Sequence, residues 1–385
     1  MRQSGLFGLS DHMKRLSAEG DPLEALSRVV DFEAFRPTLV AALVYSDGTK
    51  GGRPPYDPVV MLKVLVLAAQ NNVSDMRMEW LIRDRLSWLR FLGFDLGAAT
   101  PDANTIRMFR ERLTNAGALD KVFTDFDRQL KARGYLPMGG QIVDATLVAA
   151  PKQRNTEAEK AAVKDGKTAA EIWPDDPAKA RQKDTDARWT LKFAKARLTA
   201  DGKPQADIAI PSFGYKSSIS ICGTFGFIRK GKTTDGARYD GRMLRDVVTG
   251  DNTASDVWAK GTKVPLASAN GMFREGDTAY RSQSNERWLK AQGRVSRIHS
   301  RKPKGRPMPE NVRRGNATKS KVRARVEHVF AHQKAKMGLF IRTIGIARAE
   351  TKITLANLAF NMQRLIFHEQ RTQLDPVVRT KFGLH

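Results

Sequence analysis

The spacing of apolar residues divides the chain into a helical first third and a mixed remainder. Apolar positions recur at helical spacing over residues 58–69 and over residues 75–92, and a third short helix is expected from Ala103. Proline and capping residues stand where these segments should begin, and glycine stands where the second should end. The pattern predicts an all-helical region over residues 1–135.

Beyond about residue 137 the pattern takes the period of strands. An apolar run over residues 141–150 has strand length and lies between two glycines and a proline. Further strands are predicted over residues 215–222, 224–230 and 295–299. Helices are predicted from Ser255 and over residues 284–292, 319–337 and 353–367. Strands that alternate with helices indicate a mixed α/β, or α+β, domain.

Residues 152–188 interrupt this pattern with a polar stretch of mixed charge that contains two prolines. Such a composition predicts an insertion of weak structure, in which Asp184 and Asp186 are solvated. Trp189 follows directly, and it either packs or stacks on a flipped base, of which packing is the favoured interpretation. At the other end of the chain, residues 371–385 are expected to form a tail.

The charge of the chain indicates its partner. Against 41 acidic residues there are 66 Lys and Arg, so the net charge is +25, while 41% of the residues are hydrophobic. That much apolar content excludes a disordered basic tail and predicts a folded protein with a polyanionic partner, foremost nucleic acid. The single cysteine, Cys222, excludes a disulfide framework. No segment has the pattern of a signal peptide or of a bilayer span, so a cytoplasmic protein without a membrane partner is expected.

Asp144 is an anomaly within its strand. It lies in the sequence QIVDATLVAA, where a strand that is apolar on both faces would bury the carboxylate at a cost. Metal ligation would compensate that cost. A turn cap at the end of the strand, or a pair with an arginine, would compensate it equally well.

Glu327 is a second carboxylate in an unusual position. On a helix at roughly 100° per residue, Arg323, Glu327 and Lys334 share one narrow face beside an apolar stripe. An ordinary ion pair four residues apart, worth about 0.2–0.5 kcal/mol, explains Arg323 and Glu327 but not Lys334. A third acid, Asp277, precedes a predicted helix, where acids often serve only as caps.

Two other motifs carry less weight. Residues 226–233 match the phosphate-loop pattern G-x4-G-K-[ST], but the expected helix does not follow, so no nucleotide cofactor is predicted. His328 and His332 are four residues apart without the glutamate of a zinc-protease motif, and they are interpreted as surface or packing residues.

The ordered combination of these segments resembles the DDE-type transposases of bacterial insertion sequences, in particular the InsH-like group. The resemblance rests on QIVDAT around Asp144, GDTAYRS around Asp277 and RVEHVF around Glu327. It extends to GRPPYDP, IRDRLS, FLG, PDANTI, WT and FGYK, and so covers residues 52–365. The chain departs from the family pattern at Ser218, Thr278 and Ser320, where the family has or often has His, Lys and Tyr.

The resemblance implies a ribonuclease H-like catalytic core over residues 136–151 and 189–370, with residues 152–188 inserted after its first strand. In such a core Asp144, Asp277 and Glu327 converge as catalytic residues. They would hold two Mg²⁺ or Mn²⁺ ions, because carboxylate oxygens are the ligands these hard cations prefer.

Two basic groups are candidate DNA contacts. Around the active site they are Arg301, Lys302, Lys304, Arg306, Arg313, Arg314, Lys319, Lys321, Arg323 and Lys334. Arg107 and Arg110, on the short helix from Ala103, are candidates for a helix-turn-helix-like reader within residues 1–135. Double-stranded DNA, as terminal inverted repeats and as target, is thus the expected partner, and joining two element ends implies a homodimer or higher oligomer.

Two other functions remain open from the sequence. A non-catalytic DNA-binding protein or regulator would use the positive charge without the carboxylates. An RNA-processing nuclease with the same metal site would prefer RNA to duplex DNA.

Overall fold

The computed structural model describes residues 8–45, 54–193, 209–260, 280–300, 303 and 306–374. They form two compact units. One unit comprises Met1–Leu136, Ala335–Gly338 and Thr354–His385, and the other comprises Pro137–Lys334 and Leu339–Ile353. Residues 354–370, which the sequence placed in the catalytic core, belong to the first of these units. There His368 packs against Tyr135, with ring centres 5.7 Å apart.

The helical unit is built from short helices, as predicted. They are α1 (Gly8–Ala18), α2 (Pro22–Val29), α3 (Arg36–Leu43), α4 (Pro58–Asn71), α5 (Asp75–Asp84), α6 (Leu86–Leu92), α7 (Ala103–Asn115) and α8 (Ala118–Ala132). The predicted caps are present: Asp57 accepts from the N–H groups of Val59 and Val60, and Asp102 accepts from that of Thr105. The single helix predicted over residues 75–92 is wrong, because Arg85 is extended and separates α5 from α6.

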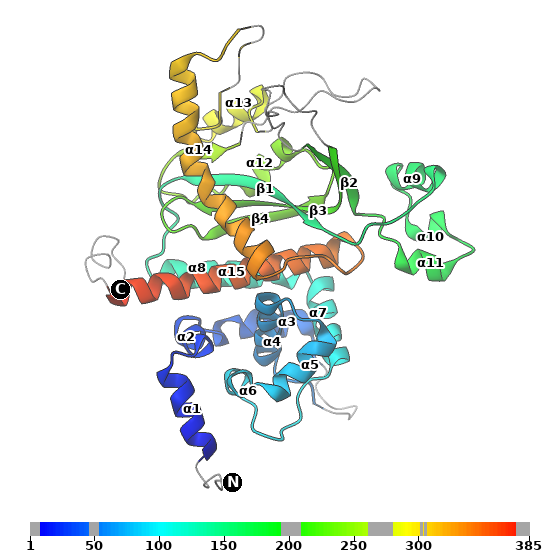
Figure 1. Ribbon diagram of the computed structural model, residues 1–385, viewed down its shortest axis with the longest axis vertical. Coiled ribbons are helices and arrows are strands. Elements are labelled where there is room, and N and C mark those ends of the chain that lie inside the picture. The colour runs from blue at the N-terminus through cyan, green and yellow to red at the C-terminus, as the bar shows by residue number, and fades with distance from the viewer. Residues whose placement is uncertain are drawn as a thin grey trace, which may run out of the picture. The chain divides into compact units, whose positions relative to one another are not determined.

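A mixed sheet forms the centre of the other unit (Figure 1). Its strands are β1 (Gln141–Ala149), β2 (Arg188–Phe193), β3 (Ala209–Cys222), β4 (Ile228–Asp235), β5 (Asp256–Ala259) and β6 (Val295–Ser296). The strand order is β2-β3-β1-β5-β6, and β4 pairs with β3. β3 is antiparallel to β1, β2 and β4, whereas β5 is parallel to both β1 and β6.

The register of β1 decides which way its side chains point. Asp144 lies opposite Ile219 and Thr146 lies opposite Ser217 on β3, so these four side chains share one face of the sheet. The neighbouring Val143 points to the other face, into a core that includes Leu244, Val257, Tyr280 and Leu289. The strand is therefore apolar on one face and carries its carboxylate on the other.

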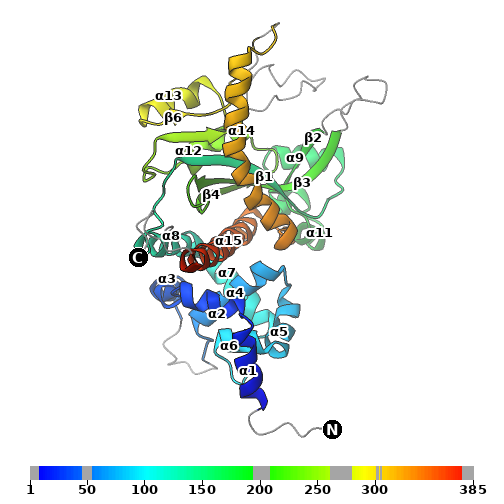
Figure 2. The same ribbon diagram turned by 60° about the vertical axis from the view of Figure 1, so that its left-hand side comes forward.

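Helices flank this sheet. They are α12 (Leu244–Val247), α13 (Gln283–Ala291), α14 (Glu310–Ala331) and the first part of α15 (Ile346–Leu374). Both ribbon views show α14 crossing the sheet over β1 (Figures 1 and 2). A π-helical segment, His332–Lys336, continues directly from α14.

Two element predictions need correction. The helix expected from Ser255 is the strand β5, because these residues pair with β1 and β6. The helix expected from Lys319 begins at Glu310, directly after Pro309. Its first turns are supported by Asn316, whose side chain accepts from the Ser300 N–H and donates to the Ser300 carbonyl.

The segment predicted to be a weakly structured insertion is a small helical subdomain. It contains α9 (Glu157–Lys164), α10 (Ala169–Ile172) and α11 (Pro177–Gln182), and α9 and α10 each begin with a capping box. Trp173 is buried at its centre, where the indole N–H donates to Glu159, and Lys179 bonds the same carboxylate oxygen.

Asp184, predicted to be solvated, is buried. Both of its carboxylate oxygens accept from the hydroxyl of Tyr215 on β3, at 2.8 and 2.6 Å, and one also accepts from the N–H groups of Asp186 and Ala187. Asp186 in turn accepts from the N–H of Ile346 at the start of α15. These contacts fix the end of the insertion to β3 and α15.

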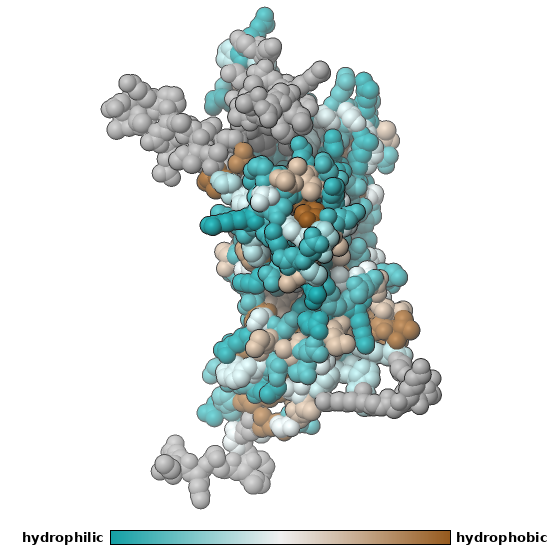
Figure 3. All heavy atoms as spheres, turned by 90° about the vertical axis from the view of Figure 1, so that its right-hand side faces the viewer, coloured by the Kyte–Doolittle hydropathy of each residue, from teal (hydrophilic) through white to brown (hydrophobic). Residues whose placement is uncertain are grey.

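The face of the molecule shown in Figure 3 is mostly polar. On that face, hydrophilic residues cover most of the described surface, and apolar residues lie in small separate groups. Among the described residues, none of the helices combines the length and apolarity that crossing a bilayer requires.

Candidate active site

The site is built around Asp144, near the middle of β1. The Asp144 side chain is 8% exposed, and its Oδ2 accepts from Nη1 of Arg323 on α14 at 2.5 Å. Its other oxygen accepts from the N–H of Ala145 at 2.9 Å. Of the alternatives that the sequence left open for this carboxylate, the pair with an arginine is present.

Arg323 joins two of the predicted catalytic acids. The same Nη1 that contacts Asp144 also donates to Oε1 of Glu327 at 2.9 Å. The Arg323 side chain is 14% exposed, whereas that of Glu327 is 52% exposed. Two carboxylate oxygens, one from a strand and one from a helix, therefore converge on a single cationic nitrogen.

Lys334 lies on the same side of β1. It belongs to the π-helical segment that follows α14, and its Nζ donates to the hydroxyl of Thr146 at 2.6 Å. Thr146 is two residues beyond Asp144 on the same face of the strand. Arg323 and Lys334 both contact β1 and Glu327 contacts Arg323, as a shared face requires, but Lys334 lies in the π-helical segment and not, as predicted, on the α-helix itself. Thr146 itself was not anticipated, because a threonine in a strand is unremarkable until the helix above it is placed.

Burial dominates the electrostatics of the site. Removal of Asp144 from water raises the pKa of its carboxyl to about 6, although Arg323 and the Ala145 N–H oppose that increase. Burial also lowers the pKa of His299, and the nearby charges of Arg323 and Lys319 lower it further. Arg323 therefore favours the ionised form of Asp144, which burial disfavours.

Tyr280 was not predicted from the sequence, and it lies in the core on the face of the sheet opposite Asp144. It is fully buried, and its pKa is raised well above the usual value by burial and by the charge of Asp144. Among the described residues its hydroxyl has no hydrogen-bond partner, and neither does Nε of Arg323. Its position three residues after Asp277 was the only available signal.

Several predicted site residues lie outside the described residues, namely Asp277, Arg301, Lys302 and Lys304. Within the described ranges, no group of three or more His, Cys, Asp or Glu side chains gathers in a geometry that would hold a metal ion. The third acid of the predicted set is therefore untested by the geometry.

The remaining candidate DNA contacts around the site differ in their surroundings. Arg306, Arg314 and Lys321 are exposed. Arg313 pairs with Glu310 at 2.6 Å, and Nζ of Lys319 donates to the Ile298 carbonyl at 2.9 Å. A phosphate would therefore have to compete with Glu310 for Arg313 and with the Ile298 carbonyl for Lys319.

The two predicted DNA contacts on α7 of the helical unit also differ in exposure and in bonding partners. Arg110 makes two bonds of 2.7 Å to the carboxylate of Asp75 on α5, and that pair is only about one-fifth exposed. Arg107 is exposed, and among the described residues its guanidinium donates to Asn104 of its own helix at 2.6 Å. The structure thus engages Arg110 in packing α5 against α7, whereas Arg107 remains open to solvent.

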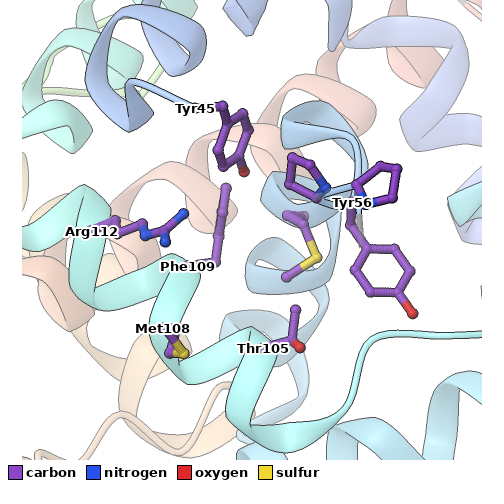
Figure 4. A pocket seen from close by; sticks show the side chains of 9 residues that line it. Tyr45, Tyr56, Thr105, Met108, Phe109 and Arg112 are labelled. Atoms are coloured by element: carbon purple, nitrogen blue, oxygen red, sulfur yellow. The ribbon is translucent and has the colours of Figure 1, made fainter. Parts of the chain in front are cut away.

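A pocket lies beside α7 and the start of α4 (Figure 4). It is lined by Tyr45, Pro54, Pro55, Tyr56, Met61, Thr105, Met108, Phe109 and Arg112. The Arg112 guanidinium lies 5.9 Å from the centre of the Tyr45 ring. None of the described lining residues is acidic, so this pocket is not a metal site.

The phosphate-loop match is explained by the fold. Residues 228–233 lie in β4, which pairs antiparallel with β3. A phosphate loop requires a loop that leads into a helix at its lysine. The motif is therefore a coincidence of sequence within a strand.

Comparison with known families agrees with the two units. Residues 10–112 match the family described as Transposase domain (DUF772), and residues 136–362 match the family described as Transposase DDE domain. No solved structure matches the chain. Because the second match spans more than half of its length, the chain belongs to the DDE transposase family of insertion sequences.

Proposed function

We propose that this transposase cleaves DNA at terminal inverted repeats and transfers the freed strand into target DNA, using Asp144, Asp277 and Glu327 to hold two divalent metal ions. The observation that carries the proposal is the convergence of Asp144 and Glu327 on one cationic nitrogen. The elements that bring these two acids together are β1 and α14, which also present Lys334 at the same place.

The donor set fits a divalent metal ion. Asp144 and Glu327 supply carboxylate oxygens, the ligands that Mg²⁺ and Mn²⁺ prefer, and both already contact one positive charge, that of Arg323. When bound, two such ions activate the attacking oxygen and stabilise the leaving one during in-line displacement at phosphorus. Asp277 completes the set by family resemblance.

Basic residues of α14 and the segment after it would hold the DNA. Arg323 is suited to bidentate contact with a phosphate and Lys334 to contact as a point charge. Arg306, Arg314 and Lys321 would extend this contact along the backbone, because they are exposed. Arg301, Lys302 and Lys304 are proposed for the same role from the sequence alone.

The helical unit is proposed to find the element ends. Its α7 carries the exposed Arg107 at its first turns, where a helix-turn-helix-like reader would approach the groove. The strand order β2-β3-β1-β5-β6, with β4 also paired with β3, supports a ribonuclease H-like core. The α9–α11 subdomain would then be an insertion after β1. Joining two element ends requires at least two such chains on the DNA.

The test is strand mapping on end-labelled duplexes that carry the terminal repeats, with Mg²⁺ or with chelator. Wild-type protein is expected to nick only with Mg²⁺, and Asp277→Asn is expected to bind the repeats and leave them intact. Retained cleavage by Asp277→Asn would overturn the three-acid assignment. Binding without nicking by the wild type would instead favour a non-catalytic DNA-binding protein, and preference for RNA would favour an RNA nuclease.

A further inference from the structure

We infer that Arg323 is a latch on the metal site: it occupies the place between Asp144 and Glu327 until DNA draws it away, so that DNA and divalent metal bind cooperatively. The inference rests on the proposed function, because it assumes that these two acids hold a metal. It adds a role for Arg323 before the reaction begins.

The geometry makes the two states exclusive. Nη1 of Arg323 lies 2.5 Å from Oδ2 of Asp144 and 2.9 Å from Oε1 of Glu327. An ion shared by the same two oxygens needs to approach each of them to about 2.0–2.1 Å if it is Mg²⁺. That position and the position of Nη1 overlap, and two positive charges there would repel each other. The metal therefore enters only when the guanidinium leaves.

The burial of the Asp144 carboxylate explains why Arg323 occupies this place when no metal ion is bound. Asp144 is nearly inaccessible to water, and a buried carboxylate without a cation is costly. Arg323 supplies that cation from a side chain that is itself mostly buried. The described structure thus needs one positive charge at this point, from the guanidinium or from a metal ion.

The destination of the released side chain is a phosphate. Arg323 lies on α14 close to the exposed Lys321, on a helix with further exposed basic residues. Its Nε is buried without a hydrogen-bond partner among the described residues, so the guanidinium keeps an unused donor. A phosphate offers that group two oxygens in the geometry that arginine matches best. DNA bound along α14 would thereby remove Arg323 from the carboxylates.

Thermodynamic linkage gives the inference a measurable form. If DNA favours the released state, and metal binds only to that state, each ligand raises the affinity for the other by the same factor. Couplings of this kind are typically about 5–150-fold. An arginine that served only as a structural ion pair would produce no such reciprocity.

The experiment measures Mn²⁺ affinity of the full-length protein by the electron paramagnetic resonance signal of free Mn²⁺, with and without a duplex of the element end. The variants are Arg323→Ala, Arg323→Lys and, as the matched control, Arg325→Ala, whose guanidinium donates to the Gly223 carbonyl. The control removes one positive charge from the same helix without touching either carboxylate. Thermal unfolding in chelator, and after addition of Mn²⁺, is recorded in parallel to show that each variant is folded.

For the wild type, weak Mn²⁺ binding without DNA is expected to strengthen about tenfold or more with DNA. Arg323→Ala should bind Mn²⁺ at least about tenfold more tightly than the wild type without DNA, and should lose most of the gain on adding DNA. Arg323→Lys should fall between the two, since it keeps the charge but reaches one oxygen at a time.

The inference is overturned if Arg323→Ala leaves the DNA-free Mn²⁺ affinity unchanged or lowers it, or if Arg325→Ala raises it equally. The proposed function fails separately: in that case Mn²⁺ binding is absent, or is the same in Asp144→Asn as in the wild type. A result in which Asp144→Asn abolishes Mn²⁺ binding and Arg323→Ala has no effect rejects the latch alone.

Discussion

Arg323 on α14 donates a hydrogen bond of 2.5 Å to Asp144 on β1, although the two residues are 179 positions apart in the sequence. The Asp144 side chain is only 8% exposed. This pair fixes the helix to the central strand and brings Glu327 within reach of the same guanidinium. One contact therefore connects the folding of the core to the assembly of the site. Substitution of Asp144 is therefore expected to affect both the stability of the fold and the assembly of the site.

Replacement of Asp144 by Asn should abolish cleavage while DNA binding persists. The amide has nearly the volume of the carboxyl, but it carries no charge with which to hold a metal ion. Cleavage is expected to fall at least about 1,000-fold, a barrier increase of about 4 kcal/mol. Gel-shift and strand-mapping assays on the same duplex measure the two properties. Cleavage within tenfold of the wild type would exclude Asp144 from the metal site.

The stability of the metal-free protein should fall as the pH rises from about 4 to above 6. Burial raises the pKa of Asp144 from 3.8 to about 6, so the folded state holds a proton that the unfolded state releases. The stability that this proton confers is complete below pH 3.8 and is lost as the pH passes about 6, a change of about 3 kcal/mol at most.

Urea unfolding of the wild type and of Asp144→Asn, in chelator at pH 4 and pH 7.5, isolates this effect. The wild type should lose stability relative to the variant between the two values, because the variant has no proton to release at this position. A constant difference between the two proteins would show that the Asp144 carboxyl titrates normally.

Tyr215→Phe should destabilise the catalytic unit by about 1–3 kcal/mol. The substitution removes the hydroxyl that donates to both oxygens of the buried Asp184, and leaves that carboxylate with backbone N–H partners only. Urea unfolding gives the loss. Mn²⁺ affinity serves as the specificity control and should be unchanged, since neither residue contacts Asp144 or Glu327. An unchanged free energy of unfolding would mean that water replaces the lost hydroxyl.

Two arginines three residues apart on α7 should respond differently to replacement by Ala. Arg107 is exposed, so its loss should weaken DNA binding and reduce the slope of log K against log salt by about 0.9. Arg110 is paired with Asp75, so its loss should lower the free energy of unfolding by about 1–2 kcal/mol without a change in that slope. Salt titrations and urea unfolding of both variants are the measurements, and the opposite assignment of the two effects would refute this distinction.

The sequence by itself determined the elements whose local chemistry was unambiguous. The capped helices α4 and α7, the strand around Asp144 and the helix α13 stand close to where periodicity placed them, because caps, prolines and apolar spacing act within a few residues. The same helical periodicity placed Arg323, Glu327 and Lys334 on one face. The family followed from the order of three short motifs.

Only the tertiary structure decided the rest, because the deciding contacts lie far apart in the chain. Residues 256–259 became a strand through pairing with β1 and β6, and the first turns of α14 are held to Ser300 by the bonds of Asn316. Asp184 lies in a polar stretch and was predicted to be solvated, yet hydrogen bonds from the Tyr215 hydroxyl compensate the loss of water around its buried carboxylate. Local sequence specifies that a carboxylate is present, whereas a partner many residues away specifies whether it is buried, paired or open to a metal ion.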